Sequence, residues 1–218
     1  MHVPRSIPTN PYRLPCQWKL WFFGQDAGFD QAQKKCADLI QAAGNGDLTG
    51  SEWESCRGTL AQILLVDQFS RACWRGRAQA FAYDGRGEEL AEMMVAKGWY
   101  DDKLTPVERL FVTLPLQHSE DMRLQTLGVE LAGRVVTEVE AEGEAGQALK
   151  AYFDGLVGYP EQHFDVVERF GRFPHRNKSL GRESTPEEVA WLNSSERPGW
   201  ASSQDCAVLR YWDGRGEW

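Results

Sequence analysis

Hydrophobic side chains recur at three- and four-residue steps along most of the chain, which is the period of amphipathic α-helices. The pattern predicts a first long helix from Phe29 to Ala43, with Gly44 as its C-terminal cap. A second helix is predicted over 60–74, and its first half is apolar on nearly every side, which is typical of a helix surrounded by others. A third helix is predicted over 84–97.

Two capping boxes mark the starts of later helices. The segments 105–108 and 185–188 each combine a threonine cap, a proline at the first helical position and a glutamate three residues after the cap. Pro115 interrupts the pattern that follows the first box. The segment 116–139 is therefore either a kinked continuation of that helix or a fresh helix capped by Ser119.

The two ends of the chain differ in composition from its middle. We predict a proline-rich extension at 1–17, a helical domain at 18–192 and a tryptophan-rich tail at 193–218. Within the helical domain the period of a helix resumes over 148–156 and again over 163–170. No strand-like alternation of useful length interrupts these segments. We therefore predict an all-α fold, a single-domain bundle of antiparallel helices.

Charge and cysteine usage narrow the expected partners and compartment. The chain of 218 residues has a net charge of −8, which argues against nucleic acid and anionic membranes as partners, because both require an extended basic face. No segment is apolar enough for membrane insertion to be expected, and 1–14 lacks the apolar stretch of a secretory signal. The five cysteines have no ligand-like spacing, which favours the cytoplasm or another reducing intracellular compartment.

One basic segment stands out against this acidic background. Residues 166–182 carry five basic side chains and one acidic side chain, and Gly171 and Pro174 make a regular helix through them improbable. A turn rich in arginine suits phosphate or carboxylate groups, which a guanidinium binds through two parallel hydrogen bonds. The alternative is a structural network in which these arginines pair with internal carboxylates. The basic residues of the segment are Arg169, Arg172, Arg176, Lys178 and Arg182, and the proposed internal partners are Asp67, Glu120, Asp121 and Glu187.

Two further polar groups interrupt the apolar pattern. Asp67 and Arg71 stand four residues apart and therefore share a helix face, either as an intrahelical ion pair or with Asp67 orienting a histidine. His118 and Asp121 lie just after Pro115, where they could act as acid and base or hold a metal. The same residues also fit a simple helix N-terminus with no chemistry.

Three sequence strings resemble the hallmarks of one protein family. They are 60–71 (LAQILLVDQFSR), 114–121 (LPLQHSED) and 169–185, which begins with RFGRFPHRN and ends with LGREST. In their residues and in their order along the chain, these strings resemble the bacterial domain-of-unknown-function family 924, over roughly residues 18–192. Val66 and Ser70 depart from the leucine and proline that the family pattern leads us to expect. The resemblance implies an all-helical, TPR-like fold and supplies no activity.

Two classes of function fit these observations. The first is a pocket for a small anionic ligand, with a hydrolase- or transferase-like reaction and proton transfer by His118 or His175. The second is a TPR-like interaction or assembly module, whose polar motifs are structural and whose terminal extensions bind a protein partner. A third interpretation is a metal site, and the residues do not identify a cofactor. The candidate catalytic residues are His118, His175, Asp67 and Asp121, the candidate ligand-binding residues are Arg71, Arg75, Arg169, Arg172, Arg176, Asn177 and Arg182, and the candidate metal ligands are His118, Asp121, His163 and His175.

Overall fold

The computed structural model describes residues 34–144, 146 and 158–202, and this part of the chain contains helices and no β-strand. The predicted all-α class is therefore confirmed. The elements in chain order are the 3-10 helix η1 (Lys34–Cys36), α3 (Ala37–Asn45), α4 (Cys56–Ile63), the π-helix η2 (Leu64–Phe69), α5 (Ser70–Cys73), η3 (Ala78–Phe81), α6 (Asp84–Ala96), α7 (Trp99–Lys103), α8 (Pro106–His118), α9 (Met122–Ala141), α11 (Gly158–Phe170), η4 (Pro174–Arg176), α12 (Pro186–Leu192) and η5 (Gly199–Ser202).

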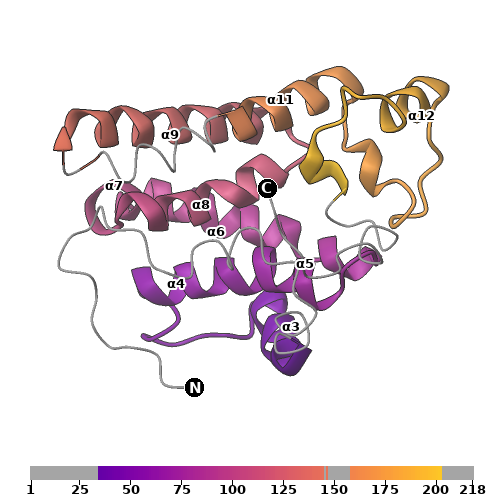
Figure 1. The fold of residues 1–218 in the computed structure, drawn as a ribbon. Helices are drawn as coiled ribbons and strands as arrows, with labels where there is room; N and C mark the ends of the chain where they lie inside the picture. The colour runs from indigo at the N-terminus through magenta and orange to yellow at the C-terminus, as the bar shows by residue number, and fades with distance from the viewer. Residues whose placement is uncertain (1–33, 145, 147–157, 203–218) are drawn as a thin grey trace, which may run out of the picture.

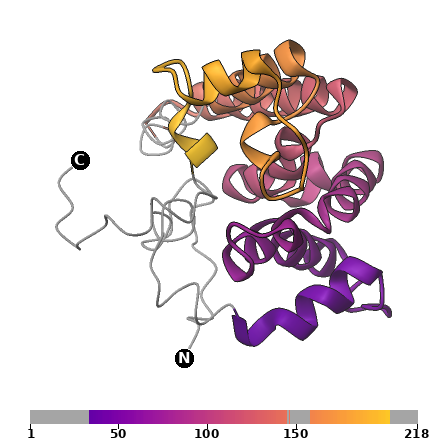
Figure 2. The same cartoon turned by 90° about the vertical axis from the view of Figure 1, so that its right-hand side faces the viewer.

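The helices stack in layers that follow the order of the chain. Helix α3 lies at one edge beside the α4–η2–α5 segment, α6 and α8 form the middle, and α9 and α11 form the opposite edge (Figures 1 and 2). Each layer contacts the next, through α4 with α6, α6 with α8, α8 with α9 and α9 with α11. The TPR-like label and the predicted domain boundaries stay predictions.

Two hydrophobic clusters fill the spaces between the layers. The larger cluster extends from α3 to α9 and contains fully buried side chains such as Ile63, Met94 and Leu116. The smaller cluster lies under the last elements, and its buried residues are Val166, Val167, Phe173, Trp191 and Ala201. The polar motifs of the sequence lie where the elements of the two clusters meet.

The end of the first described helix differs from the prediction. Helix α3 continues past Gly44 to Asn45, and the left-handed cap residue is Gly46, with φ of 78°. Gly44 serves packing instead, because a Cβ there would lie 2.1 Å from the ring of Tyr83. The predicted cap was wrong because Gly44 is required by a contact with a distant part of the chain, which the local sequence pattern does not show. The predicted start at Phe29 lies outside the described residues.

The region around Pro115 also differs from both alternatives that the sequence left open. Helix α8 includes Pro115 and ends at His118, so the proline does not end the helix. A fresh helix, α9, begins at Met122, and its N-cap is Asp121 rather than Ser119, because the Asp121 side chain accepts a hydrogen bond from the Arg123 N–H. His118 is thereby placed at the end of α8, where its side chain reaches Asp67 of η2.

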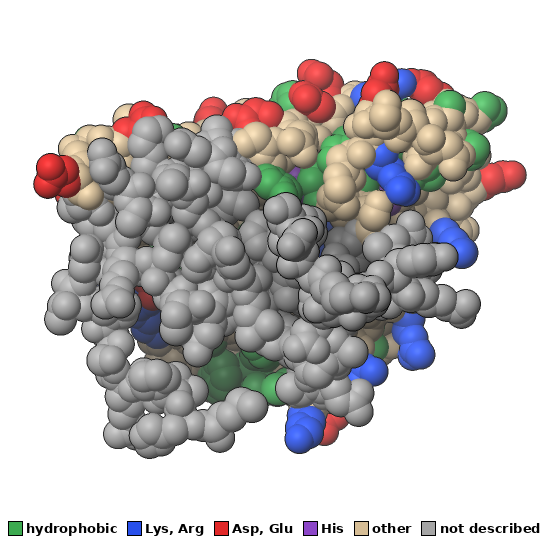
Figure 3. Space-filling model, viewed as in Figure 1, with side chains coloured by type: hydrophobic (Ala, Val, Ile, Leu, Met, Phe, Trp, Pro, Cys, Tyr) green, Lys and Arg blue, Asp and Glu red, His purple; other side chains and the backbone are tan. Residues whose placement is uncertain are grey.

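Both predicted capping boxes are confirmed, with Thr105 opening α8 and Thr185 opening α12. Within the described residues, no helix combines the length and the apolar character that crossing a membrane requires. Glu140 in the last turn of α9 and Glu142 and Glu144 beyond it are exposed, and red side chains follow the edge formed by α9 and α11 (Figure 3). The predicted helix over 148–156 lies outside the described residues, as does the prediction for 1–17.

Candidate functional site

A π-helical turn brings Asp67 into the interior. In η2 the backbone N–H of Ser70 bonds to the carbonyl of Leu65, five residues earlier, which widens the helix. Such turns are frequent at functional sites. Asp67 is only 1% exposed, and Ser70 is fully buried, with its hydroxyl donating to the Val66 carbonyl at 2.5 Å. The apolar helix predicted over 60–74 thus carries the buried carboxylate of Asp67 in its π-helical turn.

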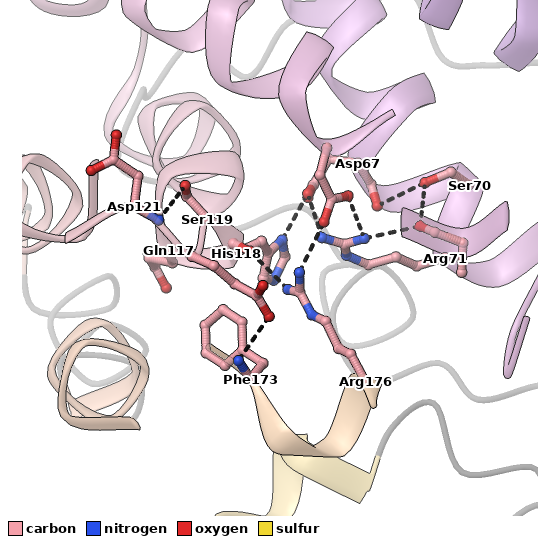
Figure 4. A network of polar contacts seen from close by, with 12 residues as sticks. Asp67, Ser70, Arg71, Gln117, His118, Ser119, Asp121, Phe173 and Arg176 are labelled. Atoms are coloured by element: carbon pink, nitrogen blue, oxygen red, sulfur yellow. Dashed lines mark hydrogen bonds and ion pairs between the residues drawn. The ribbon is translucent and has the colours of Figure 1, made fainter. Parts of the chain in front are cut away.

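Asp67 holds the imidazole of His118. His118 Nδ1 lies 2.7 Å from Asp67 Oδ1, and Arg71 Nη2 lies 3.2 Å from the same oxygen (Figure 4). Because the carboxylate only accepts, Nδ1 carries the proton of a neutral His118 ring and Nε2 carries the lone pair. Burial alone would raise the pKa of Asp67, but its pairing with His118 and Arg71 outweighs burial and lowers that pKa.

A second carboxylate, Asp84 at the start of α6, joins two buried arginines. Its Oδ1 accepts from Arg71 Nη1 at 2.9 Å, and its Oδ2 accepts from Arg176 Nη1 at 3.0 Å. Arg176 also donates to the carbonyl of His118 at 2.8 Å. Burial lowers the pKa of Arg176 to about 10, although Asp84 opposes that shift. The sequence did not reveal Asp84 as part of the site, because an aspartate opening a helix has an ordinary local explanation.

A cavity of about 60 Å³ lies beside these pairs. Three buried nitrogen atoms of residues that line it, Arg71 Nη2, Arg176 Nε and His175 Nδ1, have no hydrogen-bond partner among the described residues. Arg71 Nη2 still forms an ion pair with Asp67, which leaves Arg176 Nε and His175 Nδ1 as the unsatisfied pair. Such unpartnered buried groups are uncommon, because each costs the free energy of its lost hydration. The described residues that line the cavity are Arg71, Phe81, His118, His163, His175, Arg176 and Trp200.

Three histidines line the cavity together with the two arginines. His163 Nδ1 lies 2.7 Å from the Tyr159 carbonyl and must donate to it, so Nε2 carries the lone pair of the neutral ring. The His163 ring stacks on Trp200 with centroids 3.8 Å apart, and its centroid lies 5.8 Å from that of His118.

Burial sets the protonation of all three rings. Burial and the neighbouring His118 lower the pKa of His163 to about 3, and burial and Arg176 lower the pKa of His175 well below its ordinary value. Burial also lowers the pKa of His118, although Asp67 opposes the shift. Burial therefore shifts all three rings toward the neutral imidazole.

Most of the basic segment faces glutamates rather than the cavity. Arg172 donates through Nε and Nη2 to Glu188 at 2.7 and 2.9 Å, and Arg182 donates to Glu120 at 2.7 and 3.0 Å. Asn177 donates to Glu188 at 3.2 Å. Arg172, Arg182 and Asn177 are predicted to bind a ligand, but they form hydrogen bonds within the fold, and only Arg182 Nε among their donors is buried without a partner in the described residues. The expected partner Glu120 is correct for Arg182.

Other predicted site residues also lie outside the cavity wall. Arg169 is exposed and pairs with Glu187 at 3.0 Å, as the network interpretation expected. Arg75 lies in the turn that follows α5. Asp121 caps α9 and points away from His118 (Figure 4), so it does not orient that ring.

No group of three or more His, Cys, Asp or Glu side chains in the described part of the chain is arranged to hold a metal ion. The set of His118, Asp121, His163 and His175 therefore does not form a metal centre, because Asp121 lies apart from the three histidines. Sequence reasoning also missed Phe81 and Trp200 as wall residues. Trp200 had a signal, as an aromatic residue in the tail, but only the fold brings it onto His163.

Comparisons with known proteins support the family resemblance. The family model described as "Bacterial protein of unknown function (DUF924)" matches residues 12–196. A solved structure of a protein of unknown function from Agrobacterium tumefaciens is 35% identical, with a TM-score of 0.64, and the match covers 79% of this chain and 88% of that one. Comparison with curated proteins finds no significant match.

Proposed function

The chain belongs to the bacterial family DUF924, and we propose that its cavity binds a small anion, with His118 as the proton-transfer group of a hydrolase- or transferase-like reaction. The cavity joins two guanidinium groups to an imidazole that a carboxylate orients. This combination suits carboxylate or phosphate groups, which arginine binds and histidine serves as acid or base.

The observation that carries the proposal is the pair of unsatisfied nitrogens in the cavity wall. Arg176 Nε is always a donor, and His175 Nδ1 is a donor in one of its two neutral tautomers. Leaving a buried donor unpaired costs about 1–3 kcal/mol, and an anion in the cavity would recover that free energy. The cavity volume of about 60 Å³ is less than half that of the ~150 Å³ cavities that hold benzene. The bound group is therefore a few heavy atoms in size.

The Asp67–His118 pair supplies the chemistry. Asp67 is a positioning residue, because it fixes the Nδ1–H tautomer through the 2.7 Å contact and leaves Nε2 as the basic nitrogen. His118 also lines the cavity. His118 Nε2 would exchange a proton with a ligand or water beside it, and the two arginines would stabilise negative charge that develops on the ligand.

Ligand-induced stabilisation tests the anion site. Thermal unfolding is measured with sodium formate, sodium acetate, sodium sulfate and inorganic phosphate, and a true ligand raises the unfolding free energy by about 2.7 kcal/mol at a hundred times its Kd. Arg176→Lys keeps a positive charge beside Asp84 but lacks Nε, so this variant loses the stabilisation. Arg169→Lys is the matched control, because Arg169 is exposed and lies outside the cavity wall. Equal stabilisation of both variants, or of neither the variants nor the wild type, would overturn the proposal.

The competing function is an interaction module in which the polar motifs are structural. It is favoured by one observation, the two-point hydrogen bonding of Arg172 to Glu188 and of Arg182 to Glu120. The predicted partner surfaces at 1–17 and beyond 202 lie outside the described residues. The anion panel also separates the two functions, because a purely structural network gives no anion-dependent stabilisation.

A further inference from the structure

The charges around the cavity already balance before any ligand is present. Arg71 is paired with Asp67 at 3.2 Å and with Asp84 at 2.9 Å, and Arg176 is paired with Asp84 at 3.0 Å. The four side chains are between 2% and 14% exposed. Two guanidinium groups thus face two carboxylates in a buried setting. An anion entering this setting adds one uncompensated negative charge, which is costly in a poorly hydrated interior.

A histidine of the cavity is the available source of a compensating charge. His163 Nδ1 is bonded to a carbonyl, and His175 lies against Phe173 and Trp200. Only His118 among the three has a carboxylate in direct contact. An imidazolium at His118 would keep its Nδ1–H bond to Asp67 and would present a second N–H at Nε2. It is therefore the ring on which a proton is stabilised best.

We propose that the cavity takes up a monoanion together with one proton, and that His118 holds this proton. The inference rests on the proposed anion site and specifies its ligand class and its dependence on pH. A monoanion and one proton together leave the net charge of the cavity unchanged. A dianion would need a second proton and is disfavoured.

The groups around His118 act in both directions. Arg71, Arg176 and the burial of the ring favour the neutral imidazole, while Asp67 favours the imidazolium. A bound anion, like Asp67, favours the imidazolium and therefore promotes protonation of His118. Element by element, the titratable and charged groups around the ring are Asp67 of η2, Arg71 of α5, Asp84 and Glu88 of α6, Glu120 and Asp121 before α9, His163 of α11, and His175 and Arg176 of η4.

The consequence is that affinity depends on pH in a defined direction. Between the lower pKa of His118 in the free protein and its higher pKa in the complex, only the complex holds the extra proton. Affinity then rises about tenfold for each unit by which the pH falls. The protonated His118 also enters the reaction as a proton donor rather than as a base.

Isothermal titration calorimetry with sodium formate tests the inference, because formate stays a monoanion between about pH 6 and about pH 8. Titrations in buffers of different ionisation enthalpy count the protons taken up, and we expect close to one per formate. NMR of histidine ring carbons and nitrogens in the same sample should show His118 becoming an imidazolium. Binding without proton uptake would overturn this inference and leave the anion site standing. Proton uptake with unchanged His118 signals would overturn it as well, and absence of binding would overturn both proposals.

Two variants assign the proton to a residue. His118→Gln is expected to bind formate with no proton uptake and with affinity independent of pH, because glutamine cannot take a proton. His163→Gln is the matched control in the same cavity and should retain the uptake of about one proton. Retention of proton uptake in His118→Gln would contradict the assignment. The wild-type NMR measurement remains decisive if His118→Gln fails to fold.

Discussion

Asp84 accepts a hydrogen bond at 3.0 Å from Arg176, a residue 92 positions later in the chain. The other oxygen of the same carboxylate accepts from Arg71. A single side chain therefore joins the start of α6, the helix α5 and the turn η4 near the end of the described chain. Its effect on stability should be much larger than that of an ordinary surface ion pair.

Replacing Asp84 with asparagine should destabilise the protein by about 3–5 kcal/mol, because two buried guanidinium groups lose a shared counter-charge. Urea unfolding measures this loss. Asp101→Asn is the control, since its pair with Arg134 is exposed and such pairs contribute about 1 kcal/mol or less. Similar losses in the two variants would show that the Asp84 pairs contribute no more than surface pairs.

The lowered pKa of Glu188 predicts that the protein loses stability in acid. Hydrogen bonds from Arg172, the Thr185 N–H and Asn177 outweigh burial and lower the pKa of Glu188 from 4.5 to about 2. Its contribution is fully present above the ordinary glutamate pKa and is lost as the pH falls from there toward 2. Glu188→Gln should therefore be less stable at neutral pH and should lose less stability on acidification, as measured by urea unfolding at a series of pH values. Glu187→Gln, at an exposed neighbouring position, should follow the wild-type pH profile.

His163 contributes an acid dependence at higher pH. Its pKa falls from 6.5 to about 3 on folding, so between these values the unfolded chain binds a proton that the folded chain does not. Stability should decline as the pH falls from about 6.5 toward 3. His163→Phe keeps an aromatic ring beside Trp200 and removes the titration, so it should show a shallower decline in thermal unfolding. An unchanged slope would mean that the ring is already protonated in the fold.

Phe173 tests whether the smaller hydrophobic cluster belongs to the cooperative fold. Its ring is fully buried, with its edge toward Trp200, and Arg176 lies 4.5 Å above its centroid. Phe173→Ala should cost about 3–5 kcal/mol of unfolding free energy. Leu180→Ala, at a side chain 37% exposed, should cost far less. Two separate unfolding transitions in the wild type would contradict a single cooperative unit.

The fold class could be predicted because its signals are local. A capping box such as the one at Thr105 satisfies backbone donors within four residues, so its sequence alone indicates a helix start. The end of α3 could not be predicted in this way. Gly44 and Gly46 look alike in sequence, and only the distant ring of Tyr83 determines which glycine is needed for packing.

The group of polar side chains around Asp67 and His118 was predictable only in outline. One interpretation of the sequence was that Asp67 orients a histidine, and the structure brings His118 to that carboxylate. It could not reveal which arginines turn inward. Arg176 follows Pro174 in a short 3-10 turn and is buried, whereas Arg172 lies before that turn and reaches Glu188. That division depends on tertiary contacts and not on the spacing of the arginines.

The ion pair between Asp84 and Arg176 also has a consequence for the chain during its synthesis. The ribosome releases Asp84 and Glu120 well before it releases Arg176 and Arg182, which become their partners. Until then, the carboxylates of Asp84 and Glu120 lack the arginines that pair with them in the fold, and they must stay hydrated. A nascent chain that stops short of the last helical elements therefore lacks His175, Arg176 and Trp200, and with them part of the cavity wall.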